Sequence, residues 1–405
     1  MTILKLALVL FFIFLLLRLK LDLGLTMLLG SVLSGILFKM SLRNFFKSIV
    51  EGVLEPSTLE LVGVVLLILI LGEILRKKGS MEKLVTSLQS LIPLPRLVLV
   101  LPSSIMGLLP MPGGALFSAP MLEATSKGFN LSPERKTFLN FWFRHTWEYI
   151  WPLYPGLVMT AALWKLPVQK LIKTWFPASI VAILIGAIYI ILKIPAIGRA
   201  NNKNNKIESL FFLIKSLWEI ISVVILTFLL NIPILVSMVI ITFFSLILLK
   251  LGWNEKIKLV LKSISFKTAL LLISVMVFKR VLQNSNILDE ISGSMNHHGI
   301  LSFLSLFLLP FIIGFLTGMN QAYVGIAFPV LTPIIGTPSP NLTLLLFAYM
   351  SGFIGTFFSP SHFCLSLSAQ YFRADFKEVL KIMFLPSFSL LFVFFLLSLF
   401  TTKLL

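Results

Sequence analysis

Residues 97–127 are apolar yet interrupted by prolines and glycines, and this stretch most constrains how the chain can fold. The central interruptions are Pro110, Pro112, Gly113 and Gly114. Each flank of about 14 residues would make a helix of about 21 Å, which is shorter than the roughly 30 Å hydrocarbon core of a bilayer. Two short helices meeting at residues 111–114 predict a re-entrant hairpin whose tip lies in mid-membrane and lines a protein cavity. A single buried helix kinked at residues 110–112 is the alternative.

The composition is that of a membrane protein over the whole chain. Of the 405 residues, 58% are hydrophobic and 12% are charged, about half the charged fraction of soluble proteins. Because apolar runs recur from end to end, we expect an all-α membrane protein without a soluble domain. The first run, residues 3–17, lacks a small-residue cleavage site and leads directly into another apolar run, which favours a retained helix over a signal peptide.

Ten apolar segments are expected to cross the membrane, and two others to form re-entrant hairpins at residues 97–127 and 299–335. Amphipathic or basic connectors are expected at residues 40–56, 81–91, 167–176, 252–266, 287–298 and 373–381. The expected spans are residues 3–17, 21–38, 58–75, 136–164, 177–192, 209–230, 232–249, 268–282, 342–372 and 382–400. Two of these are broken, one at Trp151-Pro152 and one at Ser359-Pro360.

The chain divides near its midpoint into two units that follow the same plan. Residues 198–208 are polar and basic, which predicts a cytoplasmic linker between residues 1–197 and 209–405. Three pairs of similar short sequences lie about 207 to 209 residues apart: Pro120 and Pro329, Trp151-Pro152 and Ser359-Pro360, and Ile74-Leu75 and Val281-Leu282. A near-constant offset indicates duplication. Because each unit has an odd number of spans, the second copy is expected to be inverted.

The basic residues indicate the orientation of the chain. The chain's net charge of +18 at pH 7 does not indicate nucleic-acid binding, because the basic residues lie in short loops rather than on one continuous face. With the N-terminus outside, about 22 Lys and Arg residues face the cytoplasm and about 8 face the other side, a strong positive-inside bias. We expect a multi-pass protein of the cytoplasmic (inner) membrane with both termini outside. The first hairpin then enters from the cytoplasm and the second from outside.

The two hairpin tips and the two broken spans are expected to converge on a binding site. Helix N-termini there would attract an anion, whereas helix C-termini and unwound carbonyls would suit Na⁺. Small side chains at the first tip favour backbone contact, and amides at the second add donors and acceptors. The expected substrate-binding residues are Met111, Pro112, Gly113, Gly114, Trp151, Asn320, Gln321, Ser359, Ser361 and His362.

Ionisable residues within the fourth span are candidates for coupling. Arg144 and Glu148 are four residues apart and would share a helical face, with His145 one residue off it. They form either a neutralised structural ion pair or a substrate or proton site. Glu219 lacks an evident partner, and His297-His298 is expected to be a loop pair, because no Cys, Asp or Glu completes a metal-ligand set at a recognised spacing. Cys364 is the single cysteine, so no internal disulfide forms.

Three motifs resemble an uncharacterised family of integral-membrane proteins, a domain of unknown function in the ion-transporter superfamily. They are LPMPGGALFSAPM, RHTWEYIWPLYPG and SPSHFCLSLSAQYF, the last being similar to a motif of citrate and C4-dicarboxylate carriers; gluconate-type carriers are also related. The resemblance implies an elevator-type secondary carrier, usually dimeric, that moves anions with Na⁺ or H⁺. Residues 110–114 and 319–321 replace the Ser-Asn-Thr tips of the sodium–dicarboxylate branch.

The expected function is therefore secondary active transport of a small anionic solute, coupled to Na⁺ or H⁺, by a homodimer in a lipid bilayer. No catalytic residue, metal or other cofactor is expected. An intramembrane enzyme using Glu148 or His362 would need a nucleophile or metal set that the sequence does not show. An ion channel, or a non-transporting membrane receptor or assembly protein, is also compatible with the sequence.

Overall fold

The fold is all-helical throughout the part of the chain that the structure describes. This computed structural model describes residues 2–79, 95–109, 114–189, 206–285 and 299–402, with Ser87, Ile194 and Ile287. No strand occurs within these ranges. The predicted all-α fold class is confirmed there. Of the predicted linker at 198–208, residues 198–205 lie outside the described residues, and the predicted connectors at 81–91 and 287–298 lie outside them except for Ser87 and Ile287.

The first half of the chain contains nine described helices. They are α1 (Thr2–Arg18), α2 (Leu23–Leu37), α3 (Leu42–Leu54), α4 (Pro56–Lys78), α6 (Pro95–Gly107), α7 (Ala115–Thr125), α8 (Pro133–His145), α9 (Pro155–Leu163) and α10 (Val168–Tyr189). The expected break in the fourth span is present between α8 and α9. It begins earlier than Trp151-Pro152, because α8 ends at His145.

The second half contains nine described α-helices and one π-helical turn. They are α11 (Lys206–Val224), continued by the π-helical turn η2 (Ile225–Leu229), α12 (Ile234–Leu248), α13 (Trp253–Ser263), α14 (Phe266–Asn284), α16 (Gly299–Thr317), α17 (Asn320–Ile335), α18 (Leu342–Phe357), α19 (Phe363–Phe372) and α20 (Phe376–Thr402). The break predicted at Ser359-Pro360 is present between α18 and α19.

Local sequence explains where the helices of the centre begin. Ser132 accepts a hydrogen bond from the Arg135 N–H, and Pro133 follows as the first residue of α8, where proline loses no needed donor. The Asn341 side chain caps α18 by accepting from the N–H groups of Thr343 and Leu344. Both α8 and α18 thus start at a polar cap and run into apolar sequence.

Two predicted connectors are wrong, because each is part of a longer helix. Residues 167–176 and 177–192 were expected to be separate, yet α10 runs continuously through Pro177. Likewise α20 begins at Phe376 and continues through Pro386, joining the expected connector at 373–381 to the last span. Proline is tolerated in such helices because neighbouring groups satisfy the freed carbonyl, and charged side chains in the first turns can reach water.

Several helices are long and apolar enough to cross a membrane. Four described helices meet this condition by length and composition: α4, α10, α11 with η2, and α20. The bent pair α13 and α14 makes a fifth if it is one span. Shorter apolar helices include α2, α6, α12, α16, α17 and α18. The expected number of ten spans, the two re-entrant hairpins and the inverted repeat remain predictions.

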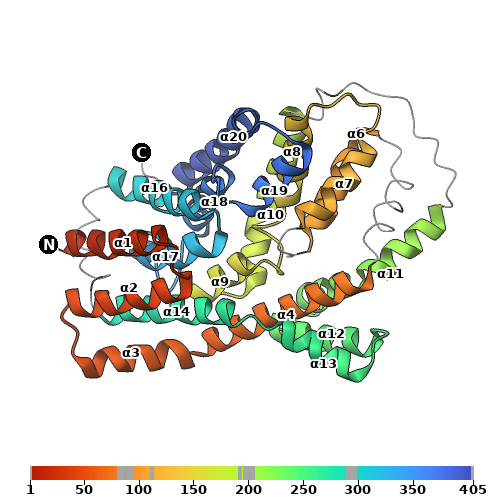
Figure 1. The fold of residues 1–405 in the computed structure, drawn as a ribbon. Helices are drawn as coiled ribbons and strands as arrows, with labels where there is room; N and C mark the ends of the chain where they lie inside the picture. The colour runs from red at the N-terminus through yellow and green to blue at the C-terminus, as the bar shows by residue number, and fades with distance from the viewer. Residues whose placement is uncertain are drawn as a thin grey trace.

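The helices form two groups, which Figure 1 shows one above the other. In the lower group, α14 packs against α2, α3 and α4, and α4 packs against α12 and α13. The upper group consists of α6–α10 and α16–α20, in which α6 contacts α7 and α8, and α16 contacts α17 and α18. Contacts between the groups run through α9 and α17, which pack on α4 and α14.

Aromatic side chains fill the core of the upper group. Phe141 of α8 lies against Phe357 of α18 with ring centroids 4.8 Å apart, and Tyr149 lies 5.2 Å from Phe353. All four rings are almost completely buried. Burial of such large rings contributes much of the packing energy of a helical core, and it holds the broken helices of the two halves together.

An ion pair joins the two halves below this core. Lys78, the last residue of α4, pairs with Glu219 of α11, whose side chain is fully buried. The Lys78 ammonium also lies 5.4 Å from the centre of the Trp218 ring, within the range of cation–π attraction. Glu219, which the sequence left without a partner, thus has one that lies 141 positions away.

We expect Lys78→Met to lower the free energy of unfolding by about 3 kcal/mol, because it leaves the buried Glu219 carboxylate without this cation. Lys78→Met/Glu219→Met should recover most of the loss. Lys77→Met, at an exposed neighbouring position, is the matched control and should change stability by less than about 0.5 kcal/mol. The measurement is unfolding of the purified protein in detergent. Equal stability of the Lys78 and Lys77 variants would contradict the assignment.

Candidate functional site

The segment at residues 144–154 supplies hydrogen-bond donors to the end of α6. Helix ends leave carbonyl groups unpaired, and lipid cannot pair with them. Four carbonyls at or next to the end of α6 receive side-chain donors from this segment. The bonds are Arg144 Nη1 to Met106 O at 2.9 Å, Trp147 Nε1 to Ser104 O at 3.0 Å, Trp151 Nε1 to Leu108 O at 2.9 Å and the Tyr154 hydroxyl to Gly107 O at 2.5 Å.

Through these bonds Arg144 and Trp151, two predicted site residues, have a structural role. Trp151 was expected to contact substrate, and Arg144 to take part in coupling, yet both satisfy backbone carbonyls of α6. Gly114, at the N-terminus of α7, lies against the Arg144 guanidinium: a Cβ there would be 2.4 Å from Nη1. Arg144 therefore connects the end of α6 to the start of α7.

Two histidines from opposite halves meet at the centre of the upper group. His145 Nε2 lies 3.2 Å from His362 Nε2, and His145 Nδ1 lies 2.6 Å from the Phe141 carbonyl. His145 is 1% exposed and His362 is 8% exposed. His145 ends α8, and His362 precedes the first residue of α19, so the ends of the two broken helices bring the rings together.

Glu148 lies beside this pair and does not share a helical face with Arg144. Because α8 ends at His145, the four-residue spacing of the sequence does not become a helical turn. Instead, Glu148 Oε1 lies 3.6 Å from His145 Nε2, and Asn320 Nδ2 donates to Glu148 Oε2 at 2.5 Å. The Tyr349 hydroxyl donates to the Glu148 carbonyl at 3.3 Å. Asn320, a predicted site residue, thus contacts the coupling candidate directly.

The N-termini of four short helices converge on these residues. Gly114 is the N-cap residue of α7 and lies beside Arg144, Asn320 is the first residue of α17, and His362 precedes α19. At the start of α9, a Cβ on Gly156 would lie 3.2 Å from Asn320 Cβ. Each N-terminus carries a partial positive charge from its unpaired N–H groups, so the arrangement favours an anion.

The remaining predicted residues lie at the edge of this cluster or outside the described residues. The Ser361 N–H donates to Ser359 Oγ at 3.2 Å, which fixes the turn before His362, and Ser361 itself is exposed. Gln321 is half-buried in the first turn of α17. Met111, Pro112 and Gly113, the predicted first hairpin tip, lie outside the described residues.

Asn140 is a central residue that sequence reasoning missed. Its Nδ2 donates to the Ala115 carbonyl at 3.2 Å and to Ser368 Oγ at 2.8 Å, and its Oδ1 accepts from Ser103 Oγ at 3.1 Å. It is fully buried. One amide therefore joins α6, α7, α8 and α19. A polar residue within the apolar run FLNFWF was the available signal.

A group of possible metal ligands also includes residues from both halves. The imidazole nitrogens of His145 and His362 and the thiol of Cys364 all lie within 4.8 Å of one another. Cys364 is half-buried in the first turn of α19. Sequence spacing gave no metal-ligand set, because His145 and His362 are 217 positions apart.

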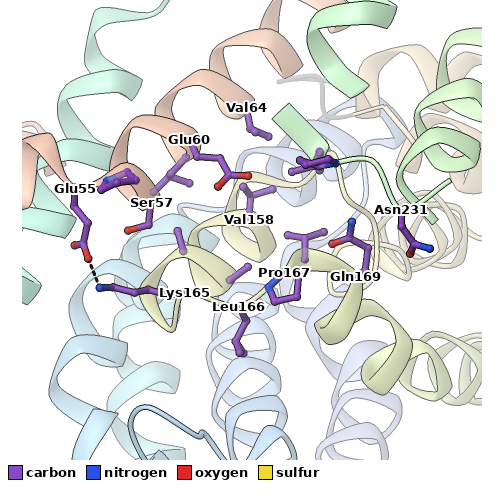
Figure 2. Close-up of a pocket in the computed structure, with 17 residues that line it drawn as sticks. Glu55, Ser57, Glu60, Val64, Val158, Lys165, Leu166, Pro167, Gln169 and Asn231 are labelled. Atoms are coloured by element: carbon purple, nitrogen blue, oxygen red, sulfur yellow. Dashed lines mark ion pairs between the residues drawn. The ribbon is translucent and has the colours of Figure 1, made fainter. Parts of the chain in front are cut away.

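A cavity of about 530 Å³ lies away from this cluster, between the two helix groups. Figure 2 shows that α4, α9 and α10 line it, with Glu55 paired to Lys165 at one end and Gln169 and Asn231 at the other. None of the residues that line it was a predicted site residue. The cavity lies where α4 faces α9, one of the contacts between the groups.

The carboxylate at the Glu55 end of this cavity is paired with basic side chains. Glu55, between α3 and α4, pairs with Lys165 Nζ at 2.6 Å and with Arg280 Nη2 at 3.4 Å. Burial raises the pKa of Glu55, but the bond to Lys165 and the charges of Lys279, Arg280 and Lys165 together lower this pKa below its usual value. The carboxylate is therefore charged at neutral pH and holds α4, α9 and α14 together.

The fold, with the buried polar centre formed by His145, Glu148, Asn320 and His362, is that of a helical membrane protein. Its two broken helices meet at this centre. The chain belongs to a family described as protein of unknown function (DUF401), whose sequence profile matches residues 3–400. A search of curated proteins found no match. The family match covers nearly the whole chain, so both halves belong to the family.

We expect Gly107→Ala to disrupt the contact between α6 and α8, because the new Cβ would lie 2.1 Å from the Arg144 carbonyl oxygen. Forced overpacking of this kind costs about 1–3 kcal/mol or more. The matched control is Gly72→Ala in α4, where a Cβ meets nothing within 4 Å. Melting temperature in detergent should fall for Gly107→Ala only. An equal effect of the two substitutions would refute the close approach.

Proposed function

We propose that this protein is a secondary active transporter for a small anionic solute, coupled to Na⁺ or H⁺. The observation that carries the proposal is the convergence of four helix N-termini on Arg144, Glu148 and Asn320. Non-helical backbone at the centre of a membrane protein is tolerated where it lines a cavity or is buried in protein. Transporters place such broken helices at the substrate site, with N-termini pointing at anionic groups.

The proposal includes a duplicated and inverted chain. Corresponding helices make corresponding contacts: α4 packs on α12 and α13 as α14 packs on α2 and α3. The second part of each broken helix packs on a helix from the opposite half of the chain: α9 packs on α17, and α19 packs on α7. A Cβ on Gly107 would lie 2.1 Å from the Arg144 carbonyl oxygen, and a Cβ on Gly314 would lie 2.2 Å from that of Gly352. These two close approaches are about 207 residues apart, as the sequence repeat requires.

The two helix groups suggest how the solute would move. In an elevator mechanism, the upper group of Figure 1 would carry the site across the membrane while the lower group stays fixed. The cavity beside Glu60 and Gln169 lies at the boundary along which such a movement would slide. The homodimer, the cytoplasmic membrane, the outside location of both termini and the relation to anion carriers of the ion-transporter superfamily are parts of the same proposal.

If the two halves are inverted, Lys127, which follows the pair α6 and α7, and Ser339, which follows the pair α16 and α17, face opposite sides of the membrane. Both positions are exposed, and Cys364 is the single cysteine, so Cys364→Ser provides a background without thiols. We expect an impermeant maleimide added to intact cells to label Ser339→Cys, and Lys127→Cys to react only after permeabilisation. Labelling of both positions from the same side would rule out inverted topology.

Asn320 provides the test of the binding site. A thermal-shift screen of the purified protein against organic acids and oxyanions, with and without Na⁺, identifies the solute. In proteoliposomes, we expect Asn320→Ala to lower uptake of that solute by about tenfold or more, because a hydrogen bond to a charged group contributes about 1.5–3 kcal/mol. Asn44→Ala, at an exposed site in α3, is the control. Saturable uptake unchanged by Asn320→Ala would remove this site.

A further inference from the structure

The facing histidines leave room for one shared proton or one cation between them. Two imidazole nitrogens that bind the same tetrahedral Zn²⁺, each at about 2.0–2.1 Å, lie about 3.3 Å apart. The distance between His145 Nε2 and His362 Nε2 is 3.2 Å. A hydrogen bond between the rings has a similar length, so this distance alone does not distinguish a shared proton from a shared cation. The groups around the two rings distinguish them.

The backbone orients His145 as a metal ligand is usually oriented. Its Nδ1 lies 2.6 Å from the Phe141 carbonyl, which can only accept a hydrogen bond. The proton of neutral His145 therefore sits on Nδ1, and the lone pair of Nε2 points toward His362. A carbonyl that accepts from the second ring nitrogen is the common support for a metal-bound histidine.

Cys364 belongs to the same group of possible ligands as the two histidines, and Glu148, which lies beside His145, supplies the fourth ligand of the site we infer. The Cys364 thiol lies within 4.8 Å of both imidazole nitrogens, and Glu148 Oε1 lies 3.6 Å from His145 Nε2. Asn320 holds the other carboxylate oxygen, Oε2. The set contains two nitrogen ligands, one sulfur and one oxygen, which are the ligand types that tetrahedral Zn²⁺ takes in proteins.

Charge makes both anionic ligands necessary. The Arg144 guanidinium lies close enough to Glu148, His145 and His362 to act on their charges, and it opposes a cation. A thiolate and a carboxylate together offset the charge of a divalent ion, so the ion and its ligands are neutral as a group. Buried charges that are offset in this way avoid most of the cost of desolvation.

We propose that His145, His362, Cys364 and Glu148 form a binding site for a divalent transition-metal ion of the Zn²⁺ type. Soft thiolate and imidazole ligands select such ions over Mg²⁺, Ca²⁺ and Na⁺. The ion would join the end of α8 to the start of α19, and it would do so whether or not the protein transports an anion.

Cobalt provides the test, because a Co²⁺–thiolate bond gives a charge-transfer absorption band. The chain contains one cysteine, so any such band reports Cys364. The protein is purified through a tag without histidine, freed of metal with a chelator that is then removed, and titrated with Co²⁺. We expect a saturable band at one ion per chain that Zn²⁺ abolishes and Mg²⁺ does not.

The variants assign the ligands. Cys364→Ser should remove the band, and His145→Gln, His362→Gln and Glu148→Gln should each weaken metal binding by at least about tenfold. His297→Gln/His298→Gln replaces the other two of the chain's four histidines and should leave binding unchanged. Elution as a single species and an unchanged melting temperature without metal show that a variant has folded.

Alkylation of Cys364 in the unmodified chain gives a second measurement that needs no variant. Zn²⁺ should slow the reaction of Cys364 with maleimide, because a thiolate bound to the metal is not free to attack the reagent. We expect the rate to fall at least about tenfold, the same factor as the loss of metal affinity expected for the ligand variants. Mg²⁺ should not change the rate. Absence of both the band and this protection would overturn the proposal in favour of a shared proton. Unchanged affinity in folded His362→Gln, or lost affinity in His297→Gln/His298→Gln, would also overturn it.

Discussion

A backbone carbonyl that a helix leaves unpaired inside a membrane protein must find a donor, and the centre of this structure depends on that requirement. Arg144, Trp147, Trp151 and Tyr154 together satisfy the end of α6. The unwound backbone after α8 is paired in turn, since Ser179 donates to the Thr146 carbonyl and Tyr349 to the Glu148 carbonyl. Broken helices are stable here because side chains of other helices replace the missing turns.

The same requirement brings groups from the two halves together. Once α8 stops at His145, its last residues and the turn that follows face α17 and α19 rather than their own helix. His145 then meets His362, and Glu148 meets Asn320. The polar centre is thus shared, and neither half contains it alone. Asn140 extends this sharing, because it joins α6 and α7 of the first half to Ser368 of the second.

Hydrophobic runs and prolines predicted most of the helices and both central breaks, since these are local properties of the chain. Proline alone did not predict helix ends: α10 continues through Pro177 and α20 through Pro386. Helical spacing also misled at Arg144 and Glu148, because it assumes a continuous helix where α8 in fact ends between them. The contacts of the site join residues 172 and 217 positions apart, and no local pattern encodes which distant residues meet.

The partners of the first half are made late during synthesis. His145 and His362 are separated by 217 positions, which a ribosome adding about 5–20 residues per second covers in about 10 to 40 s. For comparable intervals Glu148 and Asn140 lack Asn320 and Ser368, which lie 172 and 228 positions further along the chain. The polar groups of a newly made first half therefore need temporary hydrogen-bond partners, supplied by water, a chaperone or the insertion machinery. They need these partners until the last third of the polypeptide has been synthesised.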